Sequence, residues 1–453
     1  MKIQGKRVLV VGMARSGVAV AQLLAKHGAK VIVNDNKSRE ELGDALAPLD
    51  ALPVEWALGR PAAEVLEGAD VLVISPGISI NAGFVKKAAE MGVHVTGELE
   101  VASQLSAGKL VAVTGTNGKT TTVSLLGEIF RMAGETTHVV GNIGYPYSQA
   151  GLESTAEDQF VCEVSSFQME TADAFHPHVA ALLNITEDHL NRHGTMEEYA
   201  RMKMRIFARQ TAEDYAVFNA DDPALAKLIP QVNSRVLLFS RKGEVAQGAF
   251  VRDGKITLRL DGREEIVCPA DEVFIPGPHN LENALAAACV AFAAGVKADV
   301  IARALRTFTG VEHRIEFVRE LDGVRYINDS KGTNVDSTVK AVQTMTRPTA
   351  IILGGYDKHT DFTPLVKEML AAPLIREAVL IGATADQIEQ TLLREGFTRV
   401  HRAATLKDAI DRCRALSQDG WNVLLSPACA SFDMFEDYEA RGRIFKELVN
   451  ELN

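Results

Sequence analysis

The sequence predicts an α/β protein of three domains built on largely parallel sheets. Short apolar runs alternate with amphipathic stretches along most of the chain, which is the pattern of βαβ units. With 453 residues, the chain also exceeds the roughly 100 to 200 residues of one ordinary domain. We therefore expect domains at residues 1–97, 98–311 and 312–453.

In the first domain, strands are expected at 8–12, 31–35 and 69–78, with a helix closed by Gly28 after the first. In open α/β sheets, ligands gather at the carboxyl ends of the strands. The loops after these three strands therefore form one candidate binding site.

In the second domain, strands are expected at 110–113, 160–164 and 179–185, and a helix at 280–295. Between about 231 and 276, short strand-like pieces separated by turns indicate a small β-rich insertion or subdomain. The third domain should contain four strands with helices between them, in the stretches "VRYIND", "TAIILGG", "EAVLIG" and "NVLLSPA".

The formal net charge of −11 argues against a protein that coats nucleic acid or an anionic membrane, but not against a local anion pocket. The five cysteines show no CxxC spacing, so we expect reduced thiols. No signal-peptide core opens the chain, and no run reaches the ~18 apolar residues of a membrane span. The cytoplasm is the expected location.

The stretch "VAVTGTNGKTTTV" places a strand before a glycine-containing loop and a helix after it. Backbone N–H groups at such a helix N-terminus form a cradle for an anion. Lys119 would neutralise phosphate oxygens, and the Thr120 hydroxyl would bind Mg²⁺. Only two residues separate Gly115 from Gly118, so this is a shortened variant of the P-loop. The alternative is a glycine turn with a solvated lysine.

A second glycine loop, "GMARSG" at 12–17, also follows a strand and opens a helix. Ala14 replaces the middle glycine of the dinucleotide-binding fingerprint, and Asp35 ends the next strand, where it could accept from a ribose hydroxyl. The alternative is a loop that only packs its helix on the sheet. We expect Rossmann-like N-terminal and C-terminal domains and, between them in the chain, a central mononucleotide-binding domain of the P-loop type.

Hard oxygen ligands for Mg²⁺ are available after other strands of the second domain. Glu163 fits this role, and "NITEDHLNRHG" adds Glu187, Asp188, His189 and His193. A single histidine is more often structural, but the local crowding of acids and histidines favours a site. Lys203, in a helix-like stretch, would on its own pattern be a solvated lysine.

These motifs together resemble the Mur ligase family and cover nearly the whole chain. They occur in the family's order: "TGTNGKTTT", "GNIG", "EVSSFQME", "NITEDHLNRHG", "PGPHNLENALAA", "HRIE", "INDSKGTN" and "SPACASFDMFEDYEARG". The stretch "SPACASFDMF" is typical of the members that add D-glutamate, and no "DNPR"-like motif of the diaminopimelate- or lysine-adding members is present.

The resemblance implies an ATP site, Mg²⁺ with two ions, and catalytic roles for Lys119, His189 and Lys203. The implied ATP contacts are Gly115, Thr116, Asn117, Gly118, Lys119, Thr120, Thr121, Asn283 (adenine), Arg314 (γ-phosphate) and Asp329 (ribose). The implied metal ligands are Thr120, Glu163, His189 and Lys203 as a CO₂-derived carbamate. His189 could instead be an acid/base helper.

The resemblance also implies a site for a UDP-linked sugar substrate and one for D-glutamate. The first would use Gly12, Ala14, Arg15, Ser16, Asp35, Ser75 and Asn142. The second would use Lys331, Thr333, Lys358, Ser431, Phe432 and Tyr438, whose cationic and hydroxyl groups suit two carboxylates. The loop "GGYDKHTDF" departs from the "GGDGK" form of some members, which leaves Tyr356 and Asp357 without a role.

The implied reaction joins D-glutamate to UDP-N-acetylmuramoyl-L-alanine with ATP, through an acyl phosphate, in peptidoglycan precursor synthesis. Two other classes remain as alternatives: an NAD-dependent oxidoreductase built on "GMARSG" and Asp35, and a non-catalytic protein switched by nucleotide. The expected partners are these small molecules only, and no apolar pattern demands a dimer, so a monomer is expected.

Overall fold

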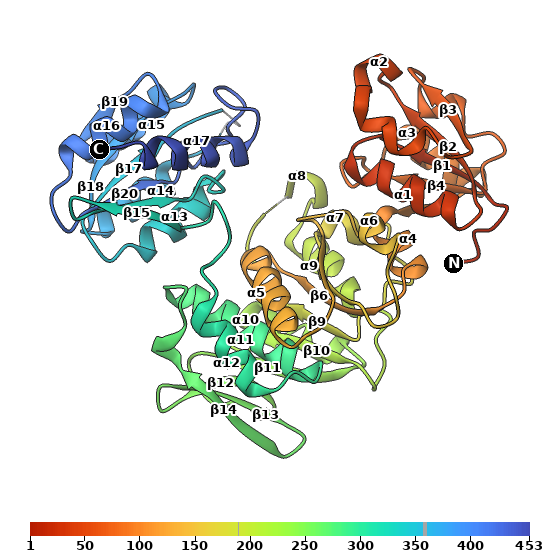
Figure 1. The fold of residues 1–453 in the computed structure, drawn as a ribbon, viewed down its shortest axis with the longest axis horizontal. Coiled ribbons are helices and arrows are strands. Elements are labelled where there is room, and N and C mark those ends of the chain that lie inside the picture. Colours follow the sequence, from red (N-terminus) through yellow and green to blue (C-terminus); the bar gives the residue numbers. More distant parts are fainter. Residues whose placement is uncertain (189, 357–359) are drawn as a thin grey trace. The chain divides into compact units, whose positions relative to one another are not determined.

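The computed structural model describes residues 1–188, 190–356 and 360–453 (Figure 1). The chain divides into two compact units. One contains residues 1–274 and 278–308, and the other contains residues 275–277 and 309–453. The first unit holds two separate sheets, and the second unit holds one.

The N-terminal sheet of the first unit has five parallel strands in the order β3-β2-β1-β4-β5. Its elements, listed in chain order, are β1 (Arg7–Val11), α1 (Arg15–Lys26), β2 (Lys30–Asp35), α2 (Arg39–Leu42), η1 (Gly43–Leu49), β3 (Val54–Leu58), η2 (Ala62–Glu64), β4 (Val71–Ile74), α3 (Gly83–Glu90) and β5 (His94–Gly97). The central strands are apolar throughout because side chains cover both faces of the sheet. The sequence had predicted β1, β2 and β4 but not β3 or β5.

The middle sheet has nine strands in the order β14-β13-β12-β11-β10-β9-β6-β8-β7. The strands are β6 (Lys109–Thr114), β7 (Thr137–Gly141), β8 (Gln159–Glu163), β9 (Val179–Leu182), β10 (Tyr215–Asn219), β11 (Arg235–Ser240), β12 (Gly248–Arg252), β13 (Lys255–Leu260) and β14 (Arg263–Pro269). Strand β12 runs parallel to β11, whereas β13 and β14 are antiparallel. The β-rich segment, expected as a small insertion or subdomain, therefore continues the main sheet through β12.

Helices cover both faces of this middle sheet. They are α4 (Glu98–Leu105), α5 (Lys119–Met132), α6 (Tyr147–Gly151), α7 (Ser166–Met169), α8 (Leu190–His193), α9 (Met196–Met204), η3 (Arg205–Phe207), α10 (Pro223–Ala226), η4 (Ile229–Gln231), η5 (Ala270–Glu272), α11 (Pro278–Ala293) and α12 (Ala298–Thr307). Val111 and Val113 face the core with α5, α11 and α12, whereas Ala112 faces the core with α4 and α6. Figure 1 shows α5 beside α11. This alternation follows from the two-residue period of a strand.

The sheet of the second unit has six strands in the order β15-β16-β20-β17-β18-β19, with only β15 antiparallel. Its elements are β15 (Glu316–Leu321), β16 (Val324–Asn328), α13 (Val335–Thr344), β17 (Thr349–Leu353), α14 (Thr363–Ala371), β18 (Ile375–Leu380), α15 (Ala385–Glu395), β19 (Val400–Arg402), α16 (Leu406–Leu416), β20 (Asn422–Leu425) and α17 (Tyr438–Asn450). Helices α13, α14 and α15 cover one face, and α16 and α17 cover the other.

The structure bears on the cysteines and on membrane-spanning helices. All five cysteines are buried, and none forms a disulfide. Within the described parts of the chain, no helix is both long enough and apolar enough to cross a membrane.

Candidate active site

The loop between β6 and α5 has the geometry of a phosphate-binding loop. Gly118 adopts φ +84°, and a side chain there would collide with the Asn283 amide, so glycine is needed on both grounds. The Lys119 Nζ donates to the carbonyl oxygens of Gly115 at 2.9 Å and Thr116 at 2.8 Å. The lysine thus lies over its own loop, at the N-terminus of a fourteen-residue helix. This arrangement suits an anion.

Asn184, which follows β9, holds this loop in place. Its side-chain oxygen accepts from the Asn117 N–H at 2.8 Å, and its side-chain amide donates to the Asn117 carbonyl at 3.1 Å. Thr116 is held as well, because its hydroxyl donates to the Thr186 carbonyl at 3.1 Å. Asn184 belongs to the motif "NITEDHLNRHG", but the sequence predicts no role for it, because only the fold brings it beside the phosphate loop.

Lys203, on α9, is buried beside the loop rather than solvated. Only 2% of it is exposed, and its Nζ donates to the Gly115 carbonyl at 2.7 Å. Burial, followed by the nearby charge of Lys119, lowers the pKa of this amine well below its usual value, against the opposing effects of Asp188 and Glu163. The lowered pKa favours the neutral amine form of Lys203.

Glu163 ends β8, next to β6 in the sheet, and is 1% exposed. One carboxylate oxygen accepts from the side-chain amide of Asn142 at 2.9 Å. The other, Oε2, is buried and has no hydrogen-bond partner among the residues that the structure describes. A buried carboxylate oxygen without a donor fits a bound cation. Asn142, expected at the sugar-nucleotide site, thus lies at the same edge of the sheet.

The remaining ATP-site residues of the first unit lie around the same loop. Thr120 and Thr121 are buried in the first turn of α5. Asn283, on α11, is buried against Gly118, and its amide donates to Asn280 at 3.2 Å. The structure therefore brings the phosphate loop, Glu163, Lys203 and Asn283 to one edge of the middle sheet.

The expected UDP-substrate residues of the N-terminal sheet gather at the carboxyl ends of β1, β2 and β4. Asp35 accepts from the Met13 N–H at 2.8 Å and from the Lys37 N–H at 3.0 Å, so it orders the glycine loop. The Ser75 hydroxyl lies 3.3 Å from the Gly12 carbonyl. The other loop residues include two exposed positions, Ala14 and Arg15, followed by the half-buried Ser16. The contact of Asp35 with a ribose stays a prediction.

In the second unit, Arg314 and Asp329 lie together. Burial raises the pKa of Asp329 to about 6, although Arg314 and a 2.6 Å hydrogen bond from Ser426 oppose the change. His313 and Ile315, on either side of Arg314, have φ values of +65° and +46°. Such strained backbone is concentrated at functional sites. Arg314 Nε is buried and lacks a hydrogen-bond partner within the described residues.

Four of the expected D-glutamate residues lie on two loops of the second unit, and Tyr438 begins α17. The loop after β16 carries Lys331 and Thr333, and the Lys331 ammonium lies 5.5 Å from the centre of the Tyr438 ring. The loop after β20 carries Ser431, which is buried, and Phe432, which is 64% exposed. Lys331 and Tyr438 are therefore close to each other.

Arg441, on α17, joins these two loops and had been given no role from the sequence. It is 1% exposed and donates to the Ser330 carbonyl at 2.8 Å and to the Cys429 carbonyl at 3.1 Å. Burial lowers its pKa to about 10. The arginine lies in the quoted motif "SPACASFDMFEDYEARG", but its buried position follows only from the packing of α17.

Two expected site residues, His189 and Lys358, lie outside the described residues, as does Asp357. Among the described residues, no group of three His, Cys, Asp or Glu side chains is arranged to hold a metal ion. The fit to a cation therefore depends on the buried Glu163 oxygen and on Lys203.

The fold and this site define a multidomain nucleotide-binding protein with a phosphate loop on its middle sheet. Comparison with known proteins specifies the class further. Residues 6–97 match the Mur ligase MurD-like N-terminal domain, residues 113–291 the Mur ligase middle domain, and residues 313–429 the Mur ligase glutamate ligase domain. The chain belongs to the Mur ligase family.

Relatives that align over their full length show a more specific similarity than the family. Two proteins named UDP-N-acetylmuramoylalanine--D-glutamate ligase, from Thermoanaerobacter sp. strain X514 and Clostridioides difficile strain 630, are 45% and 44% identical to this chain. Each alignment covers 100% of both sequences.

Solved structures share the fold at low identity. MurC from Thermotoga maritima has a TM-score of 0.59 at 18% identity, covering 98% of this chain and 99% of that one. MurF from Thermotoga maritima in complex with ADP has a TM-score of 0.58 at 17% identity, covering 93% and 95%.

Proposed function

We propose that the chain is an ATP-dependent ligase that adds D-glutamate to UDP-N-acetylmuramoyl-L-alanine in peptidoglycan precursor synthesis. The observation that carries this proposal is the phosphate loop with its two lysines, in a chain whose full-length relatives bear that ligase name. An oxidoreductase would leave this loop unused. A nucleotide-switched binding protein would not need Lys203 as a buried neutral amine.

The phosphate loop would hold the triphosphate of ATP. Lys119 and the backbone N–H groups at the N-terminus of α5 offer positive charge to its oxygens. The substrate carboxylate attacks the γ-phosphorus, forming a new P–O bond as ADP leaves, and so becomes an acyl phosphate. The amine of D-glutamate then attacks the acyl carbon, phosphate departs, and the amine proton is lost. Phosphate is a far better leaving group than oxide.

Mg²⁺ would be held by the Thr120 hydroxyl and the Glu163 Oε2 that has no donor in the described residues. When bound, it neutralises charge on the phosphate oxygens. Lys203 would react as a neutral amine with CO₂ and become a carbamate, a carboxylate-like ligand for a second Mg²⁺. His189 would lie at the metal site or act as an acid/base helper.

We assign UDP-substrate binding to residues 1–97, ATP and Mg²⁺ binding to 98–311, and D-glutamate binding to 312–453. The first function uses Gly12, Ala14, Arg15, Ser16, Asp35, Ser75 and Asn142. The third uses Lys331, Thr333, Lys358, Ser431, Phe432 and Tyr438. The resemblance assigns Asn283 to adenine, Arg314 to the γ-phosphate and Asp329 to the ribose. The enzyme works as a monomer in the cytoplasm, where it binds neither nucleic acid nor membrane.

The test is a coupled assay of phosphate release with matched detection of the amide product. Phosphate should appear only when ATP, UDP-N-acetylmuramoyl-L-alanine and D-glutamate are all present. A panel with diaminopimelate, L-lysine, L-glutamate and D-alanine should be inactive. Lys119→Ala should lose turnover yet bind the UDP substrate unchanged. Turnover with ATP alone, or with diaminopimelate, would refute the assignment.

A further inference from the structure

The short turn after β18, formed by Gly382, Ala383 and Thr384, contacts the loop that follows β17. The Gly355 N–H donates to the Thr384 hydroxyl oxygen at 3.0 Å, and the Thr384 N–H donates to the Gly355 carbonyl at 3.0 Å. Thr384 is 1% exposed. This reciprocal pair fixes the backbone immediately before Tyr356.

The same turn also contacts the loop that follows β20. The Thr384 hydroxyl lies 3.3 Å from the sulfur of Cys429, and the Ala383 N–H donates to a carboxylate oxygen of Asp433 at 2.9 Å. Ser431 and Phe432, proposed D-glutamate residues, lie between these two anchors. The turn therefore holds both ends of the segment that carries them.

The two loops also meet each other directly. The Tyr356 N–H donates to the Ala430 carbonyl at 2.8 Å, and the rings of Tyr356 and Phe432 lie 6.3 Å apart, edge to face. A side chain at Gly382 would approach Asp433 to 2.5 Å and the Gly355 Cα to 2.9 Å. The turn and the two loops are therefore packed so closely that a Cβ atom at residue 382 would clash with both loops.

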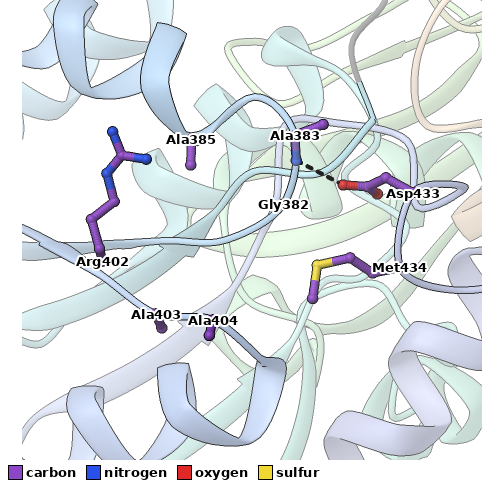
Figure 2. A pocket seen from close by; sticks show the side chains of 8 residues that line it. All are labelled: Gly382, Ala383, Ala385, Arg402, Ala403, Ala404, Asp433 and Met434. Carbon is purple, nitrogen blue, oxygen red and sulfur yellow. Dashed lines mark hydrogen bonds between the residues drawn. The ribbon is translucent and has the colours of Figure 1, made fainter.

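Packing alone does not hold this turn. On one side it faces an open hollow of about 690 Å³, whose lining includes Gly382, Ala383, Arg402 and Met434 (Figure 2). Figure 2 also shows the hydrogen bond between Ala383 and Asp433 at the edge of this hollow. Because few atoms cover the turn there, its hydrogen bonds are expected to set its position.

We propose that Thr384 and Asp433 are positioning residues that hold in place the loop after β20, which carries the proposed D-glutamate residues Ser431 and Phe432. The inference rests on the proposed function, since it needs that loop to bind D-glutamate. Neither Thr384 nor Asp433 is proposed to touch substrate. Loss of either anchor lets the loop after β20 move, and the geometry with which it meets D-glutamate is lost.

The test compares Michaelis constants for the three substrates in Thr384→Val and Asp433→Ala. Valine keeps the shape of threonine but cannot accept from Gly355. The expected result is a rise of about tenfold in KM for D-glutamate, the effect of one lost buried hydrogen bond. The KM values for ATP and the UDP substrate should stay within about twofold, because hydrogen bonds in their sites are untouched. Thr384→Ser, which keeps the hydroxyl, should have the same KM for D-glutamate as the unaltered chain.

The matched control is Thr391→Val, on α15. Thr391 is also a buried threonine of the second unit, but its hydroxyl donates to the Gln387 carbonyl of its own helix at 2.9 Å. An unchanged KM for D-glutamate in folded Thr384→Val or Asp433→Ala would overturn the inference. Equal rises in all three KM values would also overturn it, since that indicates general damage. Absence of D-glutamate-dependent turnover in the unaltered chain would overturn the proposed function as well.

Discussion

Lys119 and Lys203 donate to the same acceptor, the carbonyl oxygen of Gly115, at 2.9 and 2.7 Å. Burial of Lys203, followed by the nearby charge of Lys119, lowers the pKa of Lys203 well below its usual value. This shift favours the neutral amine that the proposed carbamate requires, while Lys119 is proposed to bind phosphate. The different roles proposed for Lys119 and Lys203 follow from this shared contact.

The first prediction concerns Lys203→Ala. Removal of the amine removes the proposed carbamate, so turnover should fall by at least about a hundredfold, as for loss of a group that acts in the transition state. Short carboxylic acids such as formate should restore part of it by supplying a carboxylate in the vacated space. Carbon NMR with ¹³C-bicarbonate should show a carbamate signal in the unaltered chain and none in Lys203→Ala.

The control for this experiment is Lys227→Ala, a change of an exposed lysine that should keep both the activity and the carbamate signal. A carbamate signal that persists in Lys203→Ala would assign the modification to another lysine and would refute this role.

The second prediction concerns Glu163→Gln. The amide oxygen can still accept from Asn142, but the charge on the second oxygen is lost. The Mg²⁺ concentration for half-maximal activity should rise by at least about tenfold, because a carboxylate is the preferred ligand. The melting temperature without Mg²⁺ should not fall, since a buried carboxylate oxygen without a donor costs free energy. Unchanged Mg²⁺ dependence would rule out Glu163 as a ligand.

The third prediction concerns Asn184→Ala. The variant loses two hydrogen bonds to the backbone of Asn117, each contributing about 1 kcal/mol. The phosphate loop should become more mobile, and KM for ATP should rise by about tenfold or more. KM for D-glutamate serves as the internal control, and an equal rise there would contradict a role confined to the phosphate loop.

The fourth prediction concerns the pH dependence of Asp329→Asn. Because burial raises the pKa from 3.8 to about 6, the folded state favours the protonated carboxyl. Its contribution to stability is complete below pH 3.8 and is lost as pH rises through 6. The lost free energy of unfolding is about 3 kcal/mol.

Asparagine should therefore raise the stability of the ligand-free protein at pH 8 and change it little near pH 4, while weakening ATP-dependent turnover. Denaturant unfolding at the two pH values measures the difference. A variant destabilised equally at both would contradict the buried carboxylate described here.

The sequence most clearly identified strands that are buried on both faces, such as β1 and β17, because long apolar runs mark them. The strands it missed are β3, β5, β7, β10, β15 and β19. Strand β15 is half-exposed at a sheet edge, and β19 has only three residues, so neither has a clear apolar pattern. That β12 to β14 continue the middle sheet depends on pairing, which a local pattern does not encode.

Some site residues could likewise be predicted from the sequence and others could not. The phosphate loop follows a strand and Glu163 ends one, so both were predicted from their positions in the sequence pattern. Lys203 looked like a solvated lysine in its helix-like stretch, and only the resemblance to a family gave it a role. Asn184 and Arg441 act through backbone groups distant in the sequence, and the fold alone brings those groups together.

The central claim is that the γ-phosphoryl group of ATP is transferred to the carboxylate of the UDP substrate. The most direct measurement uses UDP-N-acetylmuramoyl-L-alanine with ¹⁸O at both oxygens of that carboxylate. When the amine displaces phosphate, the carboxyl oxygen leaves with it, so each phosphate released should carry one ¹⁸O. Released phosphate without ¹⁸O, together with formation of the amide product, would contradict the account.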